Sequence, residues 1–218
     1  MKMSKFDDFK EILLTYLESN GIVLDIISNL HETSLNDADK NNKVYLYNGK
    51  KDLEVIDMDL IAKKGYKDIK HAKNISNNFI NTADAFLINR ENEWYFIEFK
   101  DATIKADNDK LKNNVIRKAY SNWYMLLDIL YSMRESGQID NDFVYENPIT
   151  FAKQHVHYIL VCSTEKNPTV YIQVKNCDLM GEKYTPLFMQ RLKDYLFKEA
   201  YVYTEQFLER KLVEKFVY

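Results

Sequence analysis

The chain has 218 residues and a formal net charge of −3, with 46% hydrophobic and 14% aromatic residues. This length predicts one domain over residues 1–218, and this composition excludes an intrinsically disordered chain. Because 30 basic residues are balanced by 33 acidic ones, any site for a polyanion must be local.

The glycines and cysteines exclude several classes of enzyme. The five glycines are widely spaced, which excludes glycine-rich dinucleotide and P-loop motifs, and no G-x-S-x-G is present. Cys162 and Cys177 form no C-x-x-C pair, and we expect both to be buried thiols. The chain starts without an apolar leader and has no run long enough to span a membrane, so a cytoplasmic protein is predicted.

The first part of the chain predicts an amphipathic helix followed by short extended segments. Apolar residues recur at helical spacing from Phe6 to Leu17, which predicts a helix that ends near Gly21. A second apolar segment covers 22–30, and the polar residues 36–43 predict a loop. Two short strands are expected next, at 44–47 and 53–58.

The clearest strand signal is a β-hairpin. Residues 83–89 and 93–100 are aliphatic and aromatic runs joined by the polar residues 90–92. A long amphipathic helix is then predicted from about 107 to 134, as the main cover of the sheet.

The last part of the chain predicts further strands and helices. Residues 136–154 show no clear period, and we expect a mobile connection there. Thr185 is the expected cap of a following helix, with Pro186 in its first turn. The expected elements are strands at 155–162 and 170–174 and helices at 186–198 and 204–216. Together the elements predict an α/β (α+β mixed) fold with a central mixed sheet flanked by helices.

The second strand of the hairpin ends in an acid and a base. Glu98 and Lys100 alternate with Phe99, so they share one face of the strand. With the turn at 90–92, Asp84 falls directly opposite Glu98. Opposed residues in an antiparallel pair have Cβ atoms roughly 5 Å apart, a gap that one cation can bridge. A slip of one residue would instead set Asp84 against Phe99 and break the site.

Two close carboxylates predict a metal site. Without a cation they repel each other, and the pKa of one of them is raised. Oxygen ligands with no Cys or His nearby favour Mg²⁺ or Mn²⁺ over zinc. Lys100 can orient or deprotonate an attacking water, or offset charge on a phosphate in the transition state. The predicted catalytic residues are therefore Asp84, Glu98 and Lys100, with Asp84 and Glu98 as metal ligands.

This pattern, Asp84 followed by Glu98-Phe99-Lys100 on a hairpin between an N-terminal helix and a long helix, resembles the PD-(D/E)XK phosphodiesterase superfamily. The resemblance implies a restriction-endonuclease-like core of helix, three strands, helix and strand. It also implies Mg²⁺-dependent cleavage of DNA, less often RNA, with Asp84 and Glu98 as the motif acids and Lys100 as the motif lysine. It covers residues 80–130 well and the rest in outline.

The sequence departs from the family pattern at three points. Ala83 stands in place of the name-giving proline, which is a common substitution. Many members carry an acid on the first helix, and here Glu11 and Glu18 are both candidates. The helix after the lysine lacks the Gln of a Q-x-x-x-Y motif, so Arg117 and Tyr120 stay open candidates for contact with the substrate.

Two rival sites are weaker. Asp68 also lies two residues before a lysine, with Asp57 and Asp59 upstream, but its polar surroundings predict no strand. His155 and His157 would share a strand face as candidate metal ligands, yet no Cys or acid at ligand spacing supports them.

The favoured function is a metal-dependent nuclease that hydrolyses phosphodiester bonds of nucleic acid, DNA more readily than RNA, with Mg²⁺ or Mn²⁺ as cofactor. The alternative is a nuclease-fold binding or regulatory module with weak or absent catalysis, motivated by the acidic net charge and the missing helix motif. Nucleic acid is the expected partner, a protein partner or homodimer stays open, and no membrane contact is expected.

Overall fold

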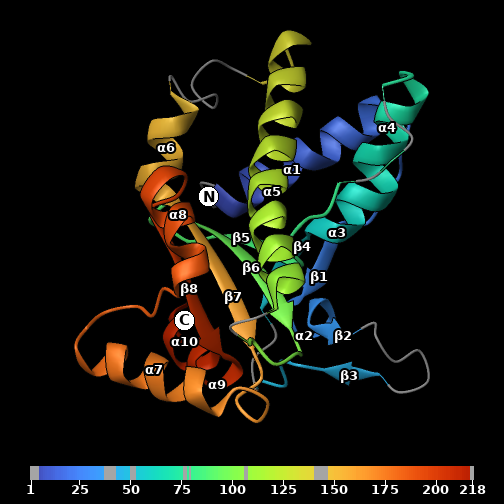
Figure 1. Ribbon diagram of the computed structural model, residues 1–218. Coiled ribbons are helices and arrows are strands. Elements are labelled where there is room, and N and C mark those ends of the chain that lie inside the picture. The colour runs from blue at the N-terminus through green and yellow to red at the C-terminus, as the bar shows by residue number, and fades with distance from the viewer. Residues whose placement is uncertain are drawn as a thin grey trace.

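A six-stranded sheet forms the centre of the computed structural model, which describes residues 5–36, 43–49, 53–75, 78, 80–105, 108–139 and 147–216. Its strands are β1 (Ile27–Asn29), β4 (Glu54–Asp57), β5 (Ala85–Ile88), β6 (Trp94–Lys100), β7 (Val156–Cys162) and β8 (Glu199–Thr204). They lie in the order β1-β4-β5-β6-β7-β8 (Figure 1). Neighbours are antiparallel from β1 to β6 and parallel from β6 to β8. The predicted mixed α/β architecture is confirmed.

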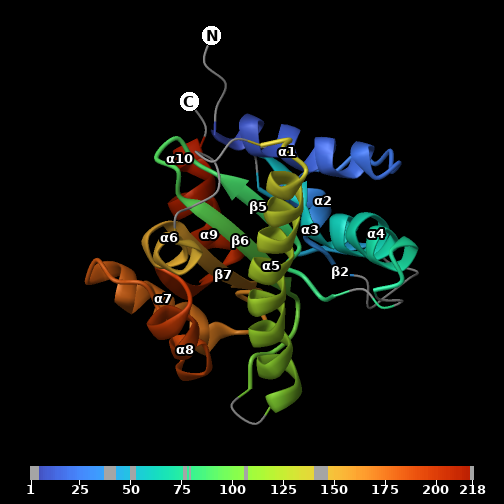
Figure 2. The ribbon, with the colours of Figure 1, turned by 90° about the horizontal axis from the view of Figure 1, so that it is seen from above.

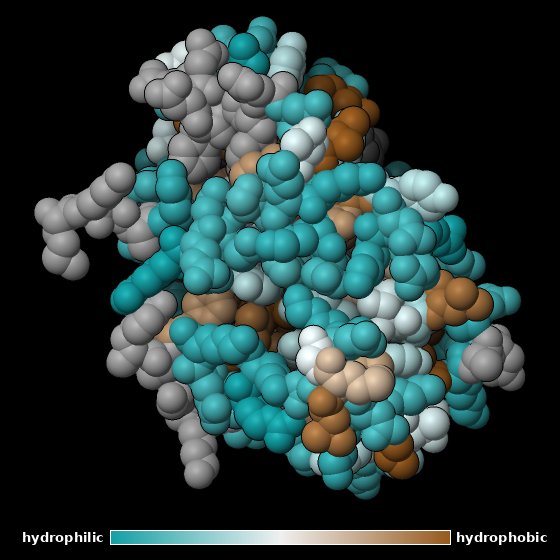
Figure 3. Space-filling model, turned by 90° about the vertical axis from the view of Figure 1, so that its left-hand side faces the viewer, coloured by the Kyte–Doolittle hydropathy of each residue, from teal (hydrophilic) through white to brown (hydrophobic). Residues whose placement is uncertain are grey.

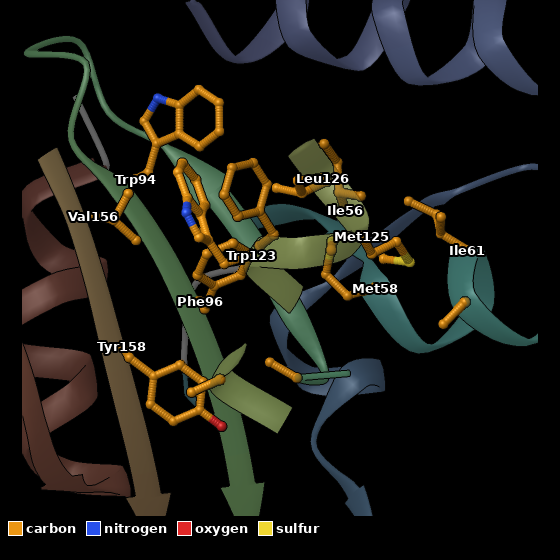
Figure 4. Close-up of a cluster of buried hydrophobic side chains, with 14 of the residues drawn as sticks. Ile56, Met58, Ile61, Trp94, Phe96, Trp123, Met125, Leu126, Val156 and Tyr158 are labelled. Atoms are coloured by element: carbon orange, nitrogen blue, oxygen red, sulfur yellow. The ribbon is translucent and has the colours of Figure 1, made fainter. Parts of the chain in front are cut away.

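One face of the sheet is covered mainly by a single long helix. This helix, α5 (Asp109–Glu135), crosses the strands, and α1 (Lys5–Ser19), α6 (Pro148–His155) and α8 (Leu187–Tyr195) complete the layer (Figures 1 and 2). Figure 4 shows the aromatic and aliphatic side chains that fill the space between α5 and the sheet. This is the face toward which the predicted acids point.

The helical periods of α1 and α5 explain this layer. In α1, Phe9 and Leu13 are buried on one stripe, and the Phe9 ring lies 4.8 Å from the Trp94 ring. The helix ends where predicted, with Gly21 at φ 75°, a conformation that glycine adopts without strain. The α5 helix starts at the cap Asn108, whose side chain accepts a hydrogen bond from the Leu111 amide at 3.1 Å.

The opposite face packs on the C-terminal helices. The second core there contains Ala85, Ile97 and Ile159 from the sheet and Leu208 and Leu212 from the C-terminal segment. The helices of that segment are α9 (Glu205–Leu208), the π-helix η3 (Glu209–Val213) and α10 (Glu214–Phe216). They follow one another without a break, which confirms the predicted terminal helix at 204–216.

Short elements complete the chain. A two-stranded sheet pairs β2 with β3. One helix follows β1, three helices follow β4, and α7 follows β7. These elements are α2 (Leu30–Thr33), β2 (Leu35–Asn36), β3 (Val44–Tyr45), α3 (Met58–Leu60), the π-helix η1 (Ile61–Tyr66), α4 (Lys67–Ala72) and α7 (Pro168–Leu179). Most of the predicted loop at 36–43 lies outside the described residues.

The predicted strand at 170–174 is wrong, because these residues belong to α7. Pro168 at the first helical position favours a helix there, and Val174 is the one side chain that α7 buries fully among its residues. The other β-branched residues of the predicted strand are not buried, since Val170 is half-buried and Ile172 is exposed. The sixth strand is instead β8, between the two helices predicted at 186–198 and 204–216.

The connection predicted at 136–154 is also partly wrong. Its residues 140–146 lie outside the described part of the chain, but Asn147 caps α6 by accepting hydrogen bonds from the amides of Ile149 and Thr150.

Thr185 does not cap α8, because its hydroxyl donates to the Ala200 carbonyl at 2.8 Å. Cys162 is buried as expected, whereas Cys177 is only partly buried.

The surface is largely polar where it can be seen. The face that carries α6, α7 and α8 is mostly hydrophilic, and its hydrophobic side chains form small separate groups (Figure 3). Single exposed hydrophobic residues of this kind are ordinary on protein surfaces. Among the described residues, no helix combines the length and apolarity needed to cross a bilayer.

Candidate active site

The β5–β6 hairpin brings the two predicted acids close together at one end. Its ladder runs from the pair of Ile88 and Trp94 to the pair of Ala85 and Ile97, in the register that the sequence predicts. The ladder stops one pair short of Asp84 and Glu98, because the Asp84 amide donates to the Ile97 carbonyl at 3.0 Å, one residue out of register. The Asp84 side chain accepts a hydrogen bond from the Phe99 amide at 2.6 Å, which holds it beside the end of β6.

Glu98 is fully buried beneath α5. Its exposed fraction is 0%, and it shares a strand face with Phe96, which lies in the core under the helix (Figure 4). The Asp84 side chain keeps 19% of its surface exposed. The pair therefore has a closed side at Glu98 and an accessible side at Asp84.

Lys118 joins the two acids, and the sequence reasoning missed it. Its Nζ lies 2.8 Å from Glu98 Oε2 and 3.4 Å from Asp84 Oδ1. Lys118 stands on α5 next to Ala119 and three residues after Val115, on the stripe that this helix buries. A lysine at a buried position of an amphipathic helix was the available signal, because a buried amine needs a carboxylate partner.

Lys100 closes the other side of Glu98. Its ammonium forms an ion pair with Glu98 Oε1, an oxygen that is buried and accepts no hydrogen bond, and the Lys100 side chain is 25% exposed. The amine therefore lies between the buried acid and solvent, where a water or a substrate can reach it.

The electrostatics reflect the crowding of two acids. Burial, followed by repulsion from Glu98, raises the pKa of Asp84 to about 7, although both lysines oppose this shift. Burial alone would lower the pKa of Lys118, but Glu98 and Asp84 together raise it above its ordinary value. Lys118 thus stays charged, and it offsets only part of the repulsion between the carboxylates.

The donor set fits a hard divalent cation. Two carboxylates converge there, and carboxylate oxygens suit Mg²⁺ or Mn²⁺. Within the described residues, no group of three or more His, Cys, Asp or Glu side chains could hold a metal. Asp84 and Glu98 would therefore supply two ligands, with water or substrate oxygens for the rest, and the Lys118 amine would have to withdraw from between them.

A pocket of about 700 Å³ opens beside Lys100. Basic and amide side chains dominate its wall, and none of the described residues that line it is a carboxylate. The lining residues are Lys100, Asn108, Lys110, Leu111, Asn113, Asn114 and Arg117. Arg117, an open candidate from the sequence, thus lies at this pocket, whereas Tyr120 is 44% exposed and is not part of the lining.

Comparisons with protein-family models, with curated proteins and with solved structures found no match to this chain. The function must therefore be inferred from the side chains of the site.

The candidate acids of the first helix are not brought to the site. Glu11 and Glu18 are both exposed on α1, away from the stripe that packs on the sheet. Asp59 comes closer, because its charge acts on Lys118 and contributes to that raised pKa. Its carboxylate pairs with Lys63 at 2.7 Å and accepts a hydrogen bond from the Thr82 hydroxyl at 2.9 Å.

The other rival acids have structural roles. Asp57 caps α3 by accepting a hydrogen bond from the Leu60 amide at 2.7 Å. Burial raises the pKa of Asp57 above its ordinary value, against the effect of that hydrogen bond. Asp68 lies on α4, where residues two apart do not share a face, so no second acid-x-lysine site forms there.

The two histidines do not share a strand. His155 ends α6, while His157 lies on β7 and shares a hydrogen bond with Glu93 at 2.6 Å. Lys198 donates to the other oxygen of Glu93 at 2.7 Å. Burial lowers the pKa of His157 to about 4 despite the Glu93 partner. The neutral His157 ring therefore donates a hydrogen bond to Glu93, and this contact has a structural role.

Proposed function

We propose that the chain is a metal-dependent nuclease of the PD-(D/E)XK kind, with Mg²⁺ or Mn²⁺ as cofactor. The observation that carries the proposal is that Asp84 and Glu98 lie together at one end of the hairpin, where both contact the Lys118 amine and Glu98 also pairs with Lys100. The order α1, antiparallel strands, α5 and β7 supports a restriction-endonuclease-like core, since it agrees with the helix, strands, helix and strand of that family.

Each side chain has a role in this mechanism. A divalent cation held by Asp84 and Glu98 would draw charge from a phosphate oxygen and acidify a nearby water. Lys100 orients that water and offsets negative charge that develops on the phosphate. Lys118 holds Glu98 in its rotamer and keeps the acids from repelling each other before the cation arrives.

The pocket beside Lys100 is suited to a nucleic-acid backbone. Lys100, Lys110 and Arg117 supply positive charge, and three asparagines supply hydrogen-bond donors for phosphate oxygens. Contacts with phosphate oxygens do not distinguish one base from another, so they would bind the backbone of a nucleic acid of any sequence. DNA remains the favoured substrate on the family resemblance, with RNA second.

A cleavage assay with paired variants tests the proposal. Plasmid, single-stranded DNA and RNA are incubated with Mg²⁺ or Mn²⁺, and we expect cleavage of at least one of them. Glu98→Gln and Lys100→Ala should each lower the rate about 100-fold or more. The controls Glu135→Gln and Lys175→Ala change exposed residues on α5 and α7 and should cleave as the parent does.

Circular dichroism and thermal melting show whether the variants keep the fold. If the parent protein leaves all three substrates intact with both metals, the nuclease proposal is wrong. Equal cleavage by the parent and Glu98→Gln would also remove it, because the activity would then come from another site or a contaminant.

The second candidate is a nuclease-fold binding or regulatory module without turnover. It is favoured by Lys118, whose amine already contacts both carboxylates where a cation would bind. A protein that binds Mn²⁺ at 100 times its dissociation constant gains about 2.7 kcal/mol of stability. No gain in melting temperature with Mn²⁺, together with metal-independent binding of nucleic acid, would select this module over the enzyme.

A further inference from the structure

A second pocket lies on the other face of the sheet from the acid pair. Its volume is about 440 Å³, within the range of small-molecule sites. The β5–β6 turn, β6, β8 and the C-terminal helices all contribute to it, and Figure 2 shows α10 beside that turn. The lining residues are Asn89, Arg90, Glu91, Tyr95, Lys183, Tyr201, Tyr203, Lys211, Leu212, Lys215 and Phe216.

Aromatic rings form the floor and one wall of this pocket. Tyr201 and Tyr203 alternate along β8, so they point to the same face, and their rings lie 4.8 Å apart. Tyr95 on β6 is backed by the His157 ring, stacked at 4.7 Å. The Phe216 ring meets Tyr95 edge-on at 5.9 Å. Tyr95, Tyr203 and Phe216 are half-buried and keep part of their rings accessible, whereas Tyr201 is buried behind them.

The charged residues that line this pocket are mostly basic. Four lining residues are basic, and Glu91, exposed in the turn, is the one acid among them. Lys211 is paired with Asp178. The Lys183 amine instead lies over the Tyr201 ring, 4.5 Å from its centroid, and no ion pair joins it to a carboxylate of the described residues.

The pKa of Lys183 reflects the positive charge of this pocket. Burial of the amine and the like charge of neighbouring lysines lower the pKa of Lys183 below its ordinary value, although Glu199 acts in the opposite direction. An anion in the pocket would relieve that repulsion. Burial raises the pKa of Tyr95, so its hydroxyl stays protonated and can donate to an anion.

We propose that this pocket binds a nucleoside phosphate, with the phosphate held by Lys183 and Lys215 and the base against Tyr95, Tyr203 and Phe216. A phosphate alone would use the amines and leave the rings uncovered, whereas a base alone would leave the amines without a counter-charge. The volume admits one nucleotide rather than a strand. The site does not depend on the nuclease proposal, because the acid pair lies on the opposite face of β6.

Calorimetric titration of the full chain in metal-free buffer tests the site. The probes are adenosine monophosphate, adenosine and inorganic phosphate. We expect saturable binding of the monophosphate and weaker binding of the two fragments. Lys183→Ala and Lys215→Ala should each raise the dissociation constant about tenfold, the loss of one charge-assisted hydrogen bond.

Matched controls separate this site from the acid pair. Lys175→Ala removes an exposed lysine of α7 and should leave the affinity unchanged, and so should Glu98→Gln. The proposal is overturned if the monophosphate shows no saturable binding at about 1 mM or below. It is also overturned if both lysine variants bind as the parent does, or if inorganic phosphate binds as tightly as the nucleotide.

Discussion

The two ends of β6 each carry a carboxylate, partly buried at Glu93 and fully buried at Glu98, and the two ends differ in how this charge is neutralised. Before the strand begins, Glu93 is a single acid that contacts His157 at 2.6 Å and Lys198 at 2.7 Å. At the far end, Glu98 lies beside a second acid, Asp84, and the pair has to share its lysines.

The pKa values follow this difference. Burial alone would raise the pKa of Glu93, but the hydrogen bonds from Lys198 and His157 bring it below its ordinary value. The pKa of Asp84 is instead raised to about 7 by burial and by Glu98. A lone acid with donors on both oxygens stabilises the fold, whereas two opposed acids give up stability for an arrangement that can bind a cation.

Loss of Lys118 should give the largest change. In Lys118→Met the two acids keep only Lys100 as a close cation, so the free energy of unfolding should fall by about 3 kcal/mol without metal. Mn²⁺ should restore part of this loss, because it replaces the missing charge. Urea unfolding with and without Mn²⁺ measures both effects.

Lys112→Met, on the same helix, is the matched control. Lys112 is paired with Asp109, whose side chain is 84% exposed, so the change should stay within about 0.5 kcal/mol. If Lys118→Met is as stable as this control, the acid pair does not have the repulsion that distinguishes it from Glu93.

At the other end of β6, His157 predicts a pH dependence. Its pKa is about 4 in the folded protein against an ordinary 6.5. Between these two pH values, His157 binds a proton in the unfolded chain but not in the folded protein. The free energy of unfolding therefore decreases as the pH falls from 6.5 to 4, by up to about 3 kcal/mol. His157→Gln should therefore flatten the pH profile of the unfolding free energy in this range.

The corresponding change at an exposed histidine, His71→Gln on α4, should leave the profile as in the parent. A His157→Gln profile that keeps the full slope between pH 4 and 6.5 would assign the loss of stability to other groups.

The smallest predicted effect concerns the tyrosine next to the acid pair. The Tyr158 hydroxyl donates to the Val115 carbonyl at 3.2 Å beneath α5 (Figure 4). Tyr158→Phe should lower the free energy of unfolding by about 1 kcal/mol, the net value of one hydrogen bond. Tyr131→Phe, at an α5 side chain that is 60% exposed, should change it by less than about 0.5 kcal/mol. Equal effects would mean that this contact does not help to seat α5 over the acids.

The hairpin was predictable because its signals are local. A short polar turn and a period of two define which residues face each other, so the pairing from Ile88 with Trp94 to Ala85 with Ile97 follows from counting along the chain. The same count places Asp84 and Glu98 at one end of the hairpin. The helix α7 was not predictable in the same way, because its apolar residues show no helical stripe and its β-branched residues favour a strand. The proline that starts the helix outweighed that preference.

Lys118 shows where local reasoning ends. Lys118 stands twenty positions after Glu98, and only the packing of α5 across the sheet brings the two within hydrogen-bond distance. The same holds for the second pocket, whose lysines come from a loop and a C-terminal helix and whose tyrosines come from β6 and β8. Neither the contact of Lys118 with the acids nor the set of residues in the second pocket can be recognised from a regular spacing along the sequence.

From its sequence alone, this protein has a mixed α/β fold, an N-terminal and a long central helix, and two acids that oppose each other with a lysine beside them. These features follow from hydrophobic periods and turn chemistry, which act over a few residues. The tertiary structure decided which lysines pair with those acids, which other acids stay away from them, and where the lysines and tyrosines of the second pocket meet. Such contacts depend on how distant elements pack, and packing is specified by the whole core rather than by any short segment.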